Sequence, residues 1–180
     1  PGFEVRTEIV VFANNARAPQ VEPWFNGKIV PFREQAARFS APRCDAPLPI
    51  PARAGFGWTT ARRESEAWIV HGCRWATQHL EVGESDDSVV RVAVHERIAA
   101  FAERFLGATD VTHRWSWISA GTCDGLPIIG PIPGQPRLVA LSGFVGNPWG
   151  LCAGAARAVA DGLQHGSSEL PRFLSSYRFV

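Results

Sequence analysis

The chain has 180 residues, of which 46% are hydrophobic and 19% charged, and its formal net charge is +1. This size and balance predict one sizeable globular domain, or two small lobes that share a core. The near-neutral charge excludes the electrostatic footprint of a nucleic-acid-binding protein. No apolar run approaches the roughly 20 residues that a membrane span needs. The chain contains no methionine, so we expect a fragment or a processed product.

The cysteines are widely spaced, with no C-x-x-C pair and no histidine at the spacing of a zinc site. They are Cys44, Cys73, Cys123 and Cys152. We therefore expect buried or free thiols, no metal site and a reducing, cytoplasmic compartment. The start of the chain lacks the basic and then apolar stretch of a signal peptide.

The first third of the chain predicts two strands and an irregular segment. Residues 7–13 form a β-branched apolar run that predicts a buried strand, which ends in a turn at Asn14-Asn15. Residues 28–39 predict a second strand, which Pro31 would confine to a sheet edge or a bulge. Four prolines between residues 41 and 54 exclude a regular element there.

The middle of the chain predicts a hairpin, a helix and a further strand. Residues 55–60 and 66–73 flank a charged turn and predict the hairpin. Apolar residues recur at helical spacing from Val90 to Leu106. Residues 115–119 are strand-like. These elements favour an antiparallel α+β lobe.

The last third predicts α/β structure. Residues 124–134 hold three prolines and three glycines and predict an extended, turn-rich segment. A short buried strand is predicted at 138–142, a glycine-punctuated turn at 143–150 and a helix of small residues at 151–163. The expected fold class is therefore α/β at the two ends of the chain with α+β between them.

The strand, turn and helix that span residues 138–163 carry the strongest chemical signal. Glycines in such a turn allow a ligand to approach the main chain closely. The amides and dipole at the helix start favour a negative or electron-rich group, and Pro148 suits a first helical turn. The alternative is that the small residues only let the helix pack tightly on a sheet.

Residues 121–134 (GTCDGLPIIGPIPG) are rigid and dense in turns, although they are also compatible with a plain connecting loop. Together with residues 138–146 (LVALSGFVG) and the helix of small residues, they resemble the C-terminal signature of the D-amino-acid oxidase superfamily, which includes glycine oxidase and sarcosine oxidase. Residues 10–14 (VVFAN) and 29–35 (IVPFREQ) are similar to the strands that leave the FAD domain and enter the substrate domain of that group.

The resemblance implies a C-terminal part of a Rossmann-like FAD-binding domain plus a substrate domain with an antiparallel sheet. Its domain limits would be 1–24 for the exit from the FAD domain, 25–117 for the substrate domain and 118–180 for the end of the FAD domain. It implies oxidation of a C–N bond of a small amine or amino-acid-like substrate, by hydride transfer to flavin and hydrolysis of the imine. The alternative is a non-catalytic ligand-binding or interaction module of the same fold.

The resemblance also assigns candidate site residues. The turn from Gly143 would lie at the pyrimidine edge of the flavin, where main-chain amides could stabilise negative charge. The cofactor-binding candidates are Asn14, Ala16, Asp124, Gly125, Pro127, Gly130, Gly143, Phe144, Val145, Gly146, Asn147 and Trp149. No catalytic acid or base is assigned.

The sequence departs from the resemblance at three places. No G-x-G-x-x-G fingerprint occurs, so we expect the chain alone to hold FAD weakly. Ser119 stands where amino-acid-oxidising relatives have a substrate-binding arginine, and Arg33 and Arg74 are the candidate replacements. A surface ion pair is the alternative for Arg74. Trp117 stands where sarcosine-oxidase relatives attach flavin to a cysteine, so we expect non-covalent FAD.

Aromatic residues and one histidine remain open to two interpretations. His71 is expected to be structural, although it could line a substrate pocket. The tryptophans of the middle segment suit either an aromatic-lined cavity or the core of a sheet. They are Trp58, Trp68, Trp75, Trp115 and Trp117.

Overall fold

The computed structural model describes residues 2–41, 52–54, 59–145, 148–166 and 170–180, with the main chain alone at 52–54 and 148–149. The chain divides into two compact units. Unit 1 comprises Pro1–Pro31 and Ser119–Val180, and unit 2 comprises Phe32–Ile118. The domain limits expected from the sequence, after residues 24 and 117, remain a prediction.

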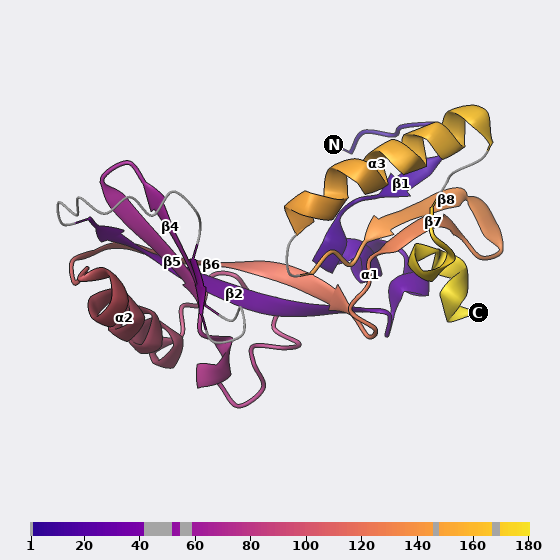
Figure 1. Cartoon of the computed structure of the whole chain (residues 1–180). Coiled ribbons are helices and arrows are strands. Elements are labelled where there is room, and N and C mark those ends of the chain that lie inside the picture. The colour runs from indigo at the N-terminus through magenta and orange to yellow at the C-terminus, as the bar shows by residue number, and fades with distance from the viewer. Residues whose placement is uncertain (1, 42–51, 55–58, 146–147, 167–169) are drawn as a thin grey trace. The chain divides into compact units, whose positions relative to one another are not determined.

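Helices separate runs of consecutive strands along the described chain (Figure 1). The strands are β1 (Val10–Phe12), β2 (Ile29–Ser40), β3 (Ala52–Ala54), β4 (Thr59–Glu64), β5 (Ala67–Gly72), β6 (Val111–Thr122), β7 (Ile128–Ile132) and β8 (Gln135–Ser142). The helices are α1 (Ala18–Val21), α2 (Val92–Leu106) and α3 (Pro148–His165). Short 3-10 turns precede and follow α1, follow β5 and close the chain.

Unit 1 is built on a three-stranded sheet of order β1-β8-β7, in which β1 runs parallel and β7 antiparallel to β8. Side chains alternate between the two faces of a strand. Ile129 of β7 therefore packs with Val139 against α3, whereas Ile128 and Ile132 join the core on the other face with Phe25. Strand β8 contributes side chains to both cores, Ala140 to one and Val139 to the other, and its end leads into the turn before α3.

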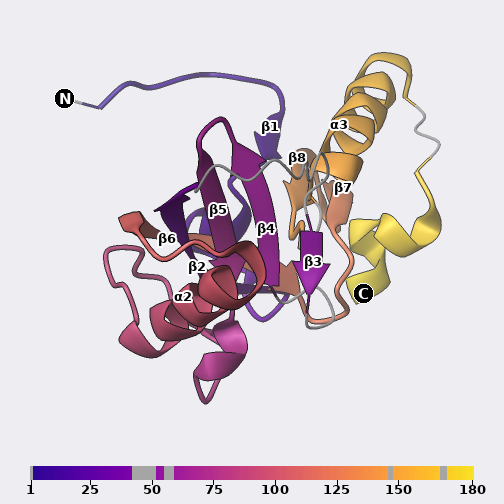
Figure 2. The same cartoon turned by 60° about the vertical axis from the view of Figure 1, so that its left-hand side comes forward.

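Unit 2 is built on the sheet of order β3-β4-β5-β2-β6, whose described pairs with β4 and β5 are antiparallel (Figure 2). Helix α2 covers this sheet because Val94, Ile98 and Ala102 share one face and pack with Trp68 and Val70. Gly107 adopts φ +63° and its amide caps the end of the helix. The predicted helix over 90–106 and the predicted hairpin, in its described part, are confirmed.

Three expectations about strands are wrong. Strand β1 is at the sheet edge among the described strands, and Val10 and Val11 are each 39% exposed rather than buried. Strand β2 is interior, between β5 and β6, and Pro31 is tolerated because the ladder with β5 begins only at Ala36, five residues later. A short strand, β3, lies at Ala52–Ala54, within the segment expected to hold no regular element, because these residues follow its last proline and pair with β4. The segment over 124–134 is extended and turn-rich as expected, and it contains strand β7, where Pro131 is tolerated at an edge beside a register shift.

The mixed α/β architecture with an antiparallel sheet agrees with the fold class expected from the sequence. Within the described ranges, no helix has the length and apolar character to cross a bilayer. Nor do the described His, Cys, Asp and Glu side chains form any group of three or more that could hold a metal ion.

Candidate functional site

The glycine turn that follows β8 is tied to the Asn14-Asn15 turn that follows β1. The amide of Gly143 donates a hydrogen bond of 2.8 Å to Oδ1 of Asn15, and the hydroxyl of Ser142 donates one of 2.8 Å to the carbonyl of Phe12. Asn15 itself adopts φ +44°, a conformation that asparagine tolerates better than most residues. The Gly143 amide is therefore engaged inside unit 1.

Gly143 also lies against the other glycine-containing segment, which begins at residue 121. It adopts φ +81°, and a Cβ atom placed there would stand 2.5 Å from Cγ2 of Thr122. Only glycine allows this approach without displacing the threonine. The two segments that carry the sequence resemblance are thus in direct contact at Thr122 and Gly143.

Asp124 is a structural anion in unit 1. Its Oδ1 accepts hydrogen bonds from the Thr122 hydroxyl at 2.8 Å and from the Leu126 amide at 3.1 Å. Arg178 donates from Nε to Oδ2 at 2.6 Å and from Nη2 to Oδ1 at 3.1 Å. These bonds from Arg178 hold the pKa of Asp124 far below its usual range. The carboxylate predicted to bind cofactor therefore already carries four protein contacts.

Two glycine candidates, Gly125 and Gly130, have open space at the Cβ position, and of these Gly130 is the buried one. It is buried in β7 opposite Ala140 and adopts φ +109°, yet a Cβ atom there would meet no described atom within 4 Å. A buried glycine with room above its Cα lets a flat group approach the main chain.

The remaining cofactor candidates lie around these contacts or outside the described residues. Asn14 and Ala16 flank Asn15, Gly125 and Pro127 belong to the Asp124 turn, and Phe144 and Val145 follow Gly143 half-buried. Helix α3 begins at Pro148, as expected for a proline in a first turn. Gly146 and Asn147 lie outside the described residues, as does the side chain of Trp149.

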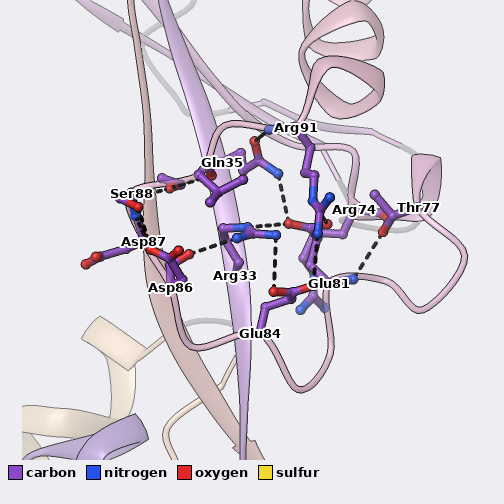
Figure 3. A network of polar contacts seen from close by, with 12 residues as sticks. Arg33, Gln35, Arg74, Thr77, Glu81, Glu84, Asp86, Asp87, Ser88 and Arg91 are labelled. Carbon is purple, nitrogen blue, oxygen red and sulfur yellow. Dashed lines mark hydrogen bonds and ion pairs between the residues drawn. The ribbon is translucent and has the colours of Figure 1, made fainter.

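Unit 2 holds Arg33 at the centre of a polar network (Figure 3). Its side chain is 1% exposed, and its Nε donates to Oε2 of Glu81 at 2.5 Å. Nη1 donates to the carbonyl of Asp86 at 2.8 Å, and Nη2 lies 3.5 Å from Glu84. Two nitrogens of the guanidinium predicted to bind substrate are therefore bonded within the protein, and Nη2 is buried with no hydrogen-bond partner among the described residues.

Glu81 is the shared partner in this network. Its Oε2 also accepts from Nε2 of Gln35 at 2.9 Å, and Oε1 of Gln35 accepts from the amide of Arg91 at 2.8 Å. Leu80 and Glu81 both adopt positive φ, at +53° and +59°. A cavity of about 450 Å³ opens beside Glu81, Glu84 and Arg91, and Arg33 is not among its described lining residues.

Arg74, the second substrate candidate, lies in the turn after β5. Its guanidinium carbon is 3.9 Å from the centroid of the Phe32 ring. Burial lowers the pKa of this guanidinium, and the charges of Glu34 and Glu81 oppose that effect. Stacking on an aromatic face leaves the edge of a guanidinium directed away from the ring. Ser119, the third candidate, is a half-buried residue of β6.

The aromatic residues of unit 2 divide between core and surface. Trp68 is 2% exposed and belongs to the core under α2, whereas Trp75 is 50% exposed. The rings of His71 and Trp117 contact each other at 5.8 Å between centroids. Trp58 lies outside the described residues. Core packing therefore accounts for Trp68, and His71 has an aromatic neighbour.

Sequence reasoning missed the residues that hold the candidate positions in place. Asn15, Arg178 and Glu81 each bind a predicted site residue across a long sequence separation. The Asn-Asn turn was a local signal for a left-handed residue. No local pattern reports that Glu81 meets Arg33, 48 residues away, because the pairing depends on the tertiary fold.

Several solved structures share this fold at low sequence identity. Glycine oxidase from Geobacillus kaustophilus aligns with a TM-score of 0.77 and 20% identity, over 96% of this chain and 46% of that protein. L-proline dehydrogenase from P. horikoshii aligns with a TM-score of 0.76 and 19% identity, over 95% and 46%. Fructosamine oxidase from Aspergillus fumigatus aligns with a TM-score of 0.74 and 11% identity, over 96% and 44%. The chain thus spans less than half of each.

No curated protein matches the chain significantly. The family described as FAD dependent oxidoreductase matches residues 1–162, which is most of the sequence. That match includes the Asn14-Asn15 turn, the contact of Thr122 with Gly143 and most of α3. On this match and on the shared fold, the chain belongs to the FAD dependent oxidoreductase family.

Proposed function

We propose that this protein oxidises a C–N bond of a small amine or amino-acid-like substrate, with FAD as the hydride acceptor. The observation that carries the proposal is the family match over residues 1–162, which includes the contact of Thr122 with Gly143 in unit 1. Glycine oxidase, proline dehydrogenase and fructosamine oxidase, whose folds are similar, are all named for nitrogen-containing substrates. FAD, when bound, supplies an electron-accepting ring that takes a hydride from a C–H bond next to nitrogen.

The residues of unit 1 fit such a ring at two points. Gly130 has open space above a buried main chain, which suits close approach of a planar group. Helix α3 is 18 residues long and its N-terminus directs a partial positive charge toward a group placed before Pro148. The amide of Gly143 is already bound to Asn15 and is not counted as a donor to the ring. The residue contributes by the close packing of the main chain that its missing side chain allows.

Substrate recognition is assigned to Arg74 in preference to Arg33. Arg74 is half-buried and stacked on Phe32, so its donors are fixed in orientation. Arg33 is fully buried and bonded to Glu81 and Asp86, and releasing it would leave buried acceptors unsatisfied. We propose that a substrate carboxylate or a similar anionic group pairs with Arg74.

Non-covalent attachment of FAD and a cytoplasmic location are parts of the same proposal. Trp117 occupies the position of a flavin-linking cysteine and packs against His71. Cys73, Cys123 and Cys152 are free thiols, which is typical of a reducing compartment.

A second candidate function is a ligand-binding module of the same fold without catalysis. The saturated carboxylate of Asp124 and the engaged amide of Gly143 favour it, because both groups already have partners inside the protein.

The test uses the product of the complete reading frame that contains this chain. We expect a yellow protein that releases FAD on denaturation and whose flavin absorbance bleaches under anaerobic conditions with an amine or amino-acid substrate. A colourless, flavin-free product would rule out the oxidoreductase. A flavin that resists bleaching by every amine and amino acid tried would favour the non-catalytic module. The Arg74→Lys variant should raise KM for acidic substrates about tenfold, as loss of a bidentate pair does.

A further inference from the structure

The C-terminal residues of unit 1 are bound to the turn that contains Asp124. Arg178 is 13% exposed at its side chain and forms two bonds to the Asp124 carboxylate. The same guanidinium donates to the carbonyls of Leu126 at 2.7 Å and Pro127 at 3.1 Å. A planar guanidinium with five N–H donors suits such a convergent set of acceptors, whereas an ammonium does not.

Arg178 is also held from its own side of the contact. Nη1 donates to the carbonyls of Leu174 and Ser175 at 3.1 and 3.2 Å. The hydroxyl of Ser176 donates to the carbonyl of Pro131, and Ile129 forms a parallel bridge with Ser175. The final turns of the chain are therefore anchored on β7 independently of the ion pair, so loss of the guanidinium should leave them docked.

The ion pair reaches the glycine turn through one further residue. Thr122 donates from its hydroxyl to Asp124 Oδ1 at 2.8 Å and to the Leu126 carbonyl at 2.7 Å. The methyl group of the same threonine occupies the space that a side chain at Gly143 would need. The rotamer of Thr122 is thus set by Asp124 and the Leu126 carbonyl together, both of which Arg178 binds, and it limits where the main chain at Gly143 can lie.

We propose that Arg178 is a positioning residue that, through Asp124 and Thr122, fixes the main chain of the turn at Gly143 for the flavin. This inference rests on the proposed function. Without the guanidinium, Asp124 loses two charged donors and keeps only the Leu126 amide and the Thr122 hydroxyl, so both acceptors of Thr122 are held less firmly. Residues 122–130 and 143–145 then sample more positions, and the ring loses a preorganised environment.

The experiment compares Arg178→Ala, Arg178→Lys and the wild type in the complete flavoprotein, with Arg172→Ala as the matched control. Arg172 is an exposed arginine of the same terminal segment and pairs with no carboxylate among the described residues. The measurements are the dissociation constant for FAD added to the apoprotein, the midpoint potential of the bound flavin, and amide hydrogen exchange by peptide. All are made well below the melting temperature.

For Arg178→Ala we expect about tenfold weaker FAD binding, as the loss of charged hydrogen bonds predicts. We also expect a more negative midpoint potential and faster exchange in 122–130 and 143–145. Arg178→Lys should be intermediate and Arg172→Ala unchanged. If Arg178→Ala does not fold, Asp124→Asn, which keeps the side-chain shape, should give the same direction of change in all three measurements.

The contrary results are distinct for the two proposals. The positioning role would be overturned if Arg178→Ala had the FAD affinity and midpoint potential of the wild type. If the alanine variant is unfolded, the same result in Asp124→Asn would overturn it. Either result would leave the proposed oxidoreductase function intact. A wild-type protein that binds no FAD at all would overturn both.

Discussion

At Gly143 the structure explains why the residue is glycine, while its amide has a different partner from the expected one. Its place in a glycine-broken turn suggested an amide that faces a ligand. In the structure that amide donates to Asn15, and the absent side chain makes room for Thr122. The residue type was predictable because φ +81° and close approach both favour glycine. The partner was not predictable, because Thr122 and Asn15 reach it through the tertiary fold.

We predict that Gly143→Ala destabilises the protein by about 3 kcal/mol. About 1 kcal/mol of this comes from the left-handed backbone and the rest from the clash with Thr122. Gly134→Ala is the matched control, because Gly134 has φ +78° but open space at its Cβ position. It should lose only the backbone part, about 1 kcal/mol. Equilibrium unfolding in urea measures both.

The clash can be separated from the backbone strain by a second substitution. Thr122→Ser removes the methyl group and keeps the hydroxyl that donates to Asp124. The double variant Thr122→Ser, Gly143→Ala should therefore recover more than 1 kcal/mol relative to Gly143→Ala alone. Equal stabilities of Gly143→Ala and Gly134→Ala would contradict the packing argument.

At the scale of elements, the network around Glu81 joins three parts of unit 2. Arg33 and Gln35 belong to β2, Glu81 to the segment after β5, and Arg91 precedes α2 (Figure 3). Glu81 is 2% exposed at its side chain and lies between the two β2 residues and Arg91. A buried carboxylate in this position offsets part of the cost of burying a guanidinium.

We predict that Glu81→Gln destabilises the protein by about 3 kcal/mol, because it leaves the buried charge of Arg33 without its main partner. Glu84→Gln is the control. Glu84 is 37% exposed and lies 3.5 Å from Arg33, so its loss should change stability by less than about 1 kcal/mol. Urea unfolding of both variants measures the loss of stability. Equal losses in Glu81→Gln and Glu84→Gln would contradict the role of Glu81 as the main partner of Arg33.

Sequence periodicity predicted some elements well and others poorly, for physical reasons. Helix α2 was predictable because Val94, Ile98 and Ala102 repeat at helical spacing on one buried face. Strand β7 was hidden, because Gly130 and Pro131 are poor strand residues that only an edge position accepts. Pro31 led to the wrong prediction of an edge strand. Strand β2 is long enough for its ladder with β5 to begin well after the proline.

At the scale of the whole molecule, the predicted cofactor residues lie in unit 1, and Arg33 and Arg74 in unit 2. The sequence could place the glycine segments because a family resemblance fixed their order along the chain. It could not tell which polar residues bind ligand and which hold the structure. That distinction depends on buried partners such as Arg178 for Asp124 and Glu81 for Arg33, which no local pattern records.

The two units also differ in how acid should affect them. His95, in α2 of unit 2, is 6% exposed, and neither ring nitrogen has a hydrogen-bond partner among the described residues. Burial, and then the charge of Arg114, lower the pKa of its imidazole. Asp124, in unit 1, has a pKa held low by Arg178. Folding therefore favours the neutral form of the His95 imidazole and the charged form of the Asp124 carboxyl group.

The sign of each effect follows from proton binding. Below the unfolded pKa of about 6.5 the unfolded chain binds a proton at His95 that the folded protein does not, so stability falls as pH decreases from there toward the folded pKa. The Asp124 contribution is complete above its unfolded pKa of about 3.9 and is lost only as pH falls below that value. Mild acid should therefore weaken unit 2 through His95 before unit 1 loses the Asp124 pair.

We predict that lowering the pH from 7.5 to 5.5 costs about 1 kcal/mol through His95, and that His95→Leu abolishes this part of the loss. His113→Gln, an exposed histidine of the same unit, should keep the wild-type pH dependence. Hydrogen exchange resolved by peptide should show the acid-sensitive amides in α2 and its sheet, with unit 1 unchanged over this range. The same pH dependence in His95→Leu and the wild type would mean that another group titrates, and that the buried imidazole tolerates its proton.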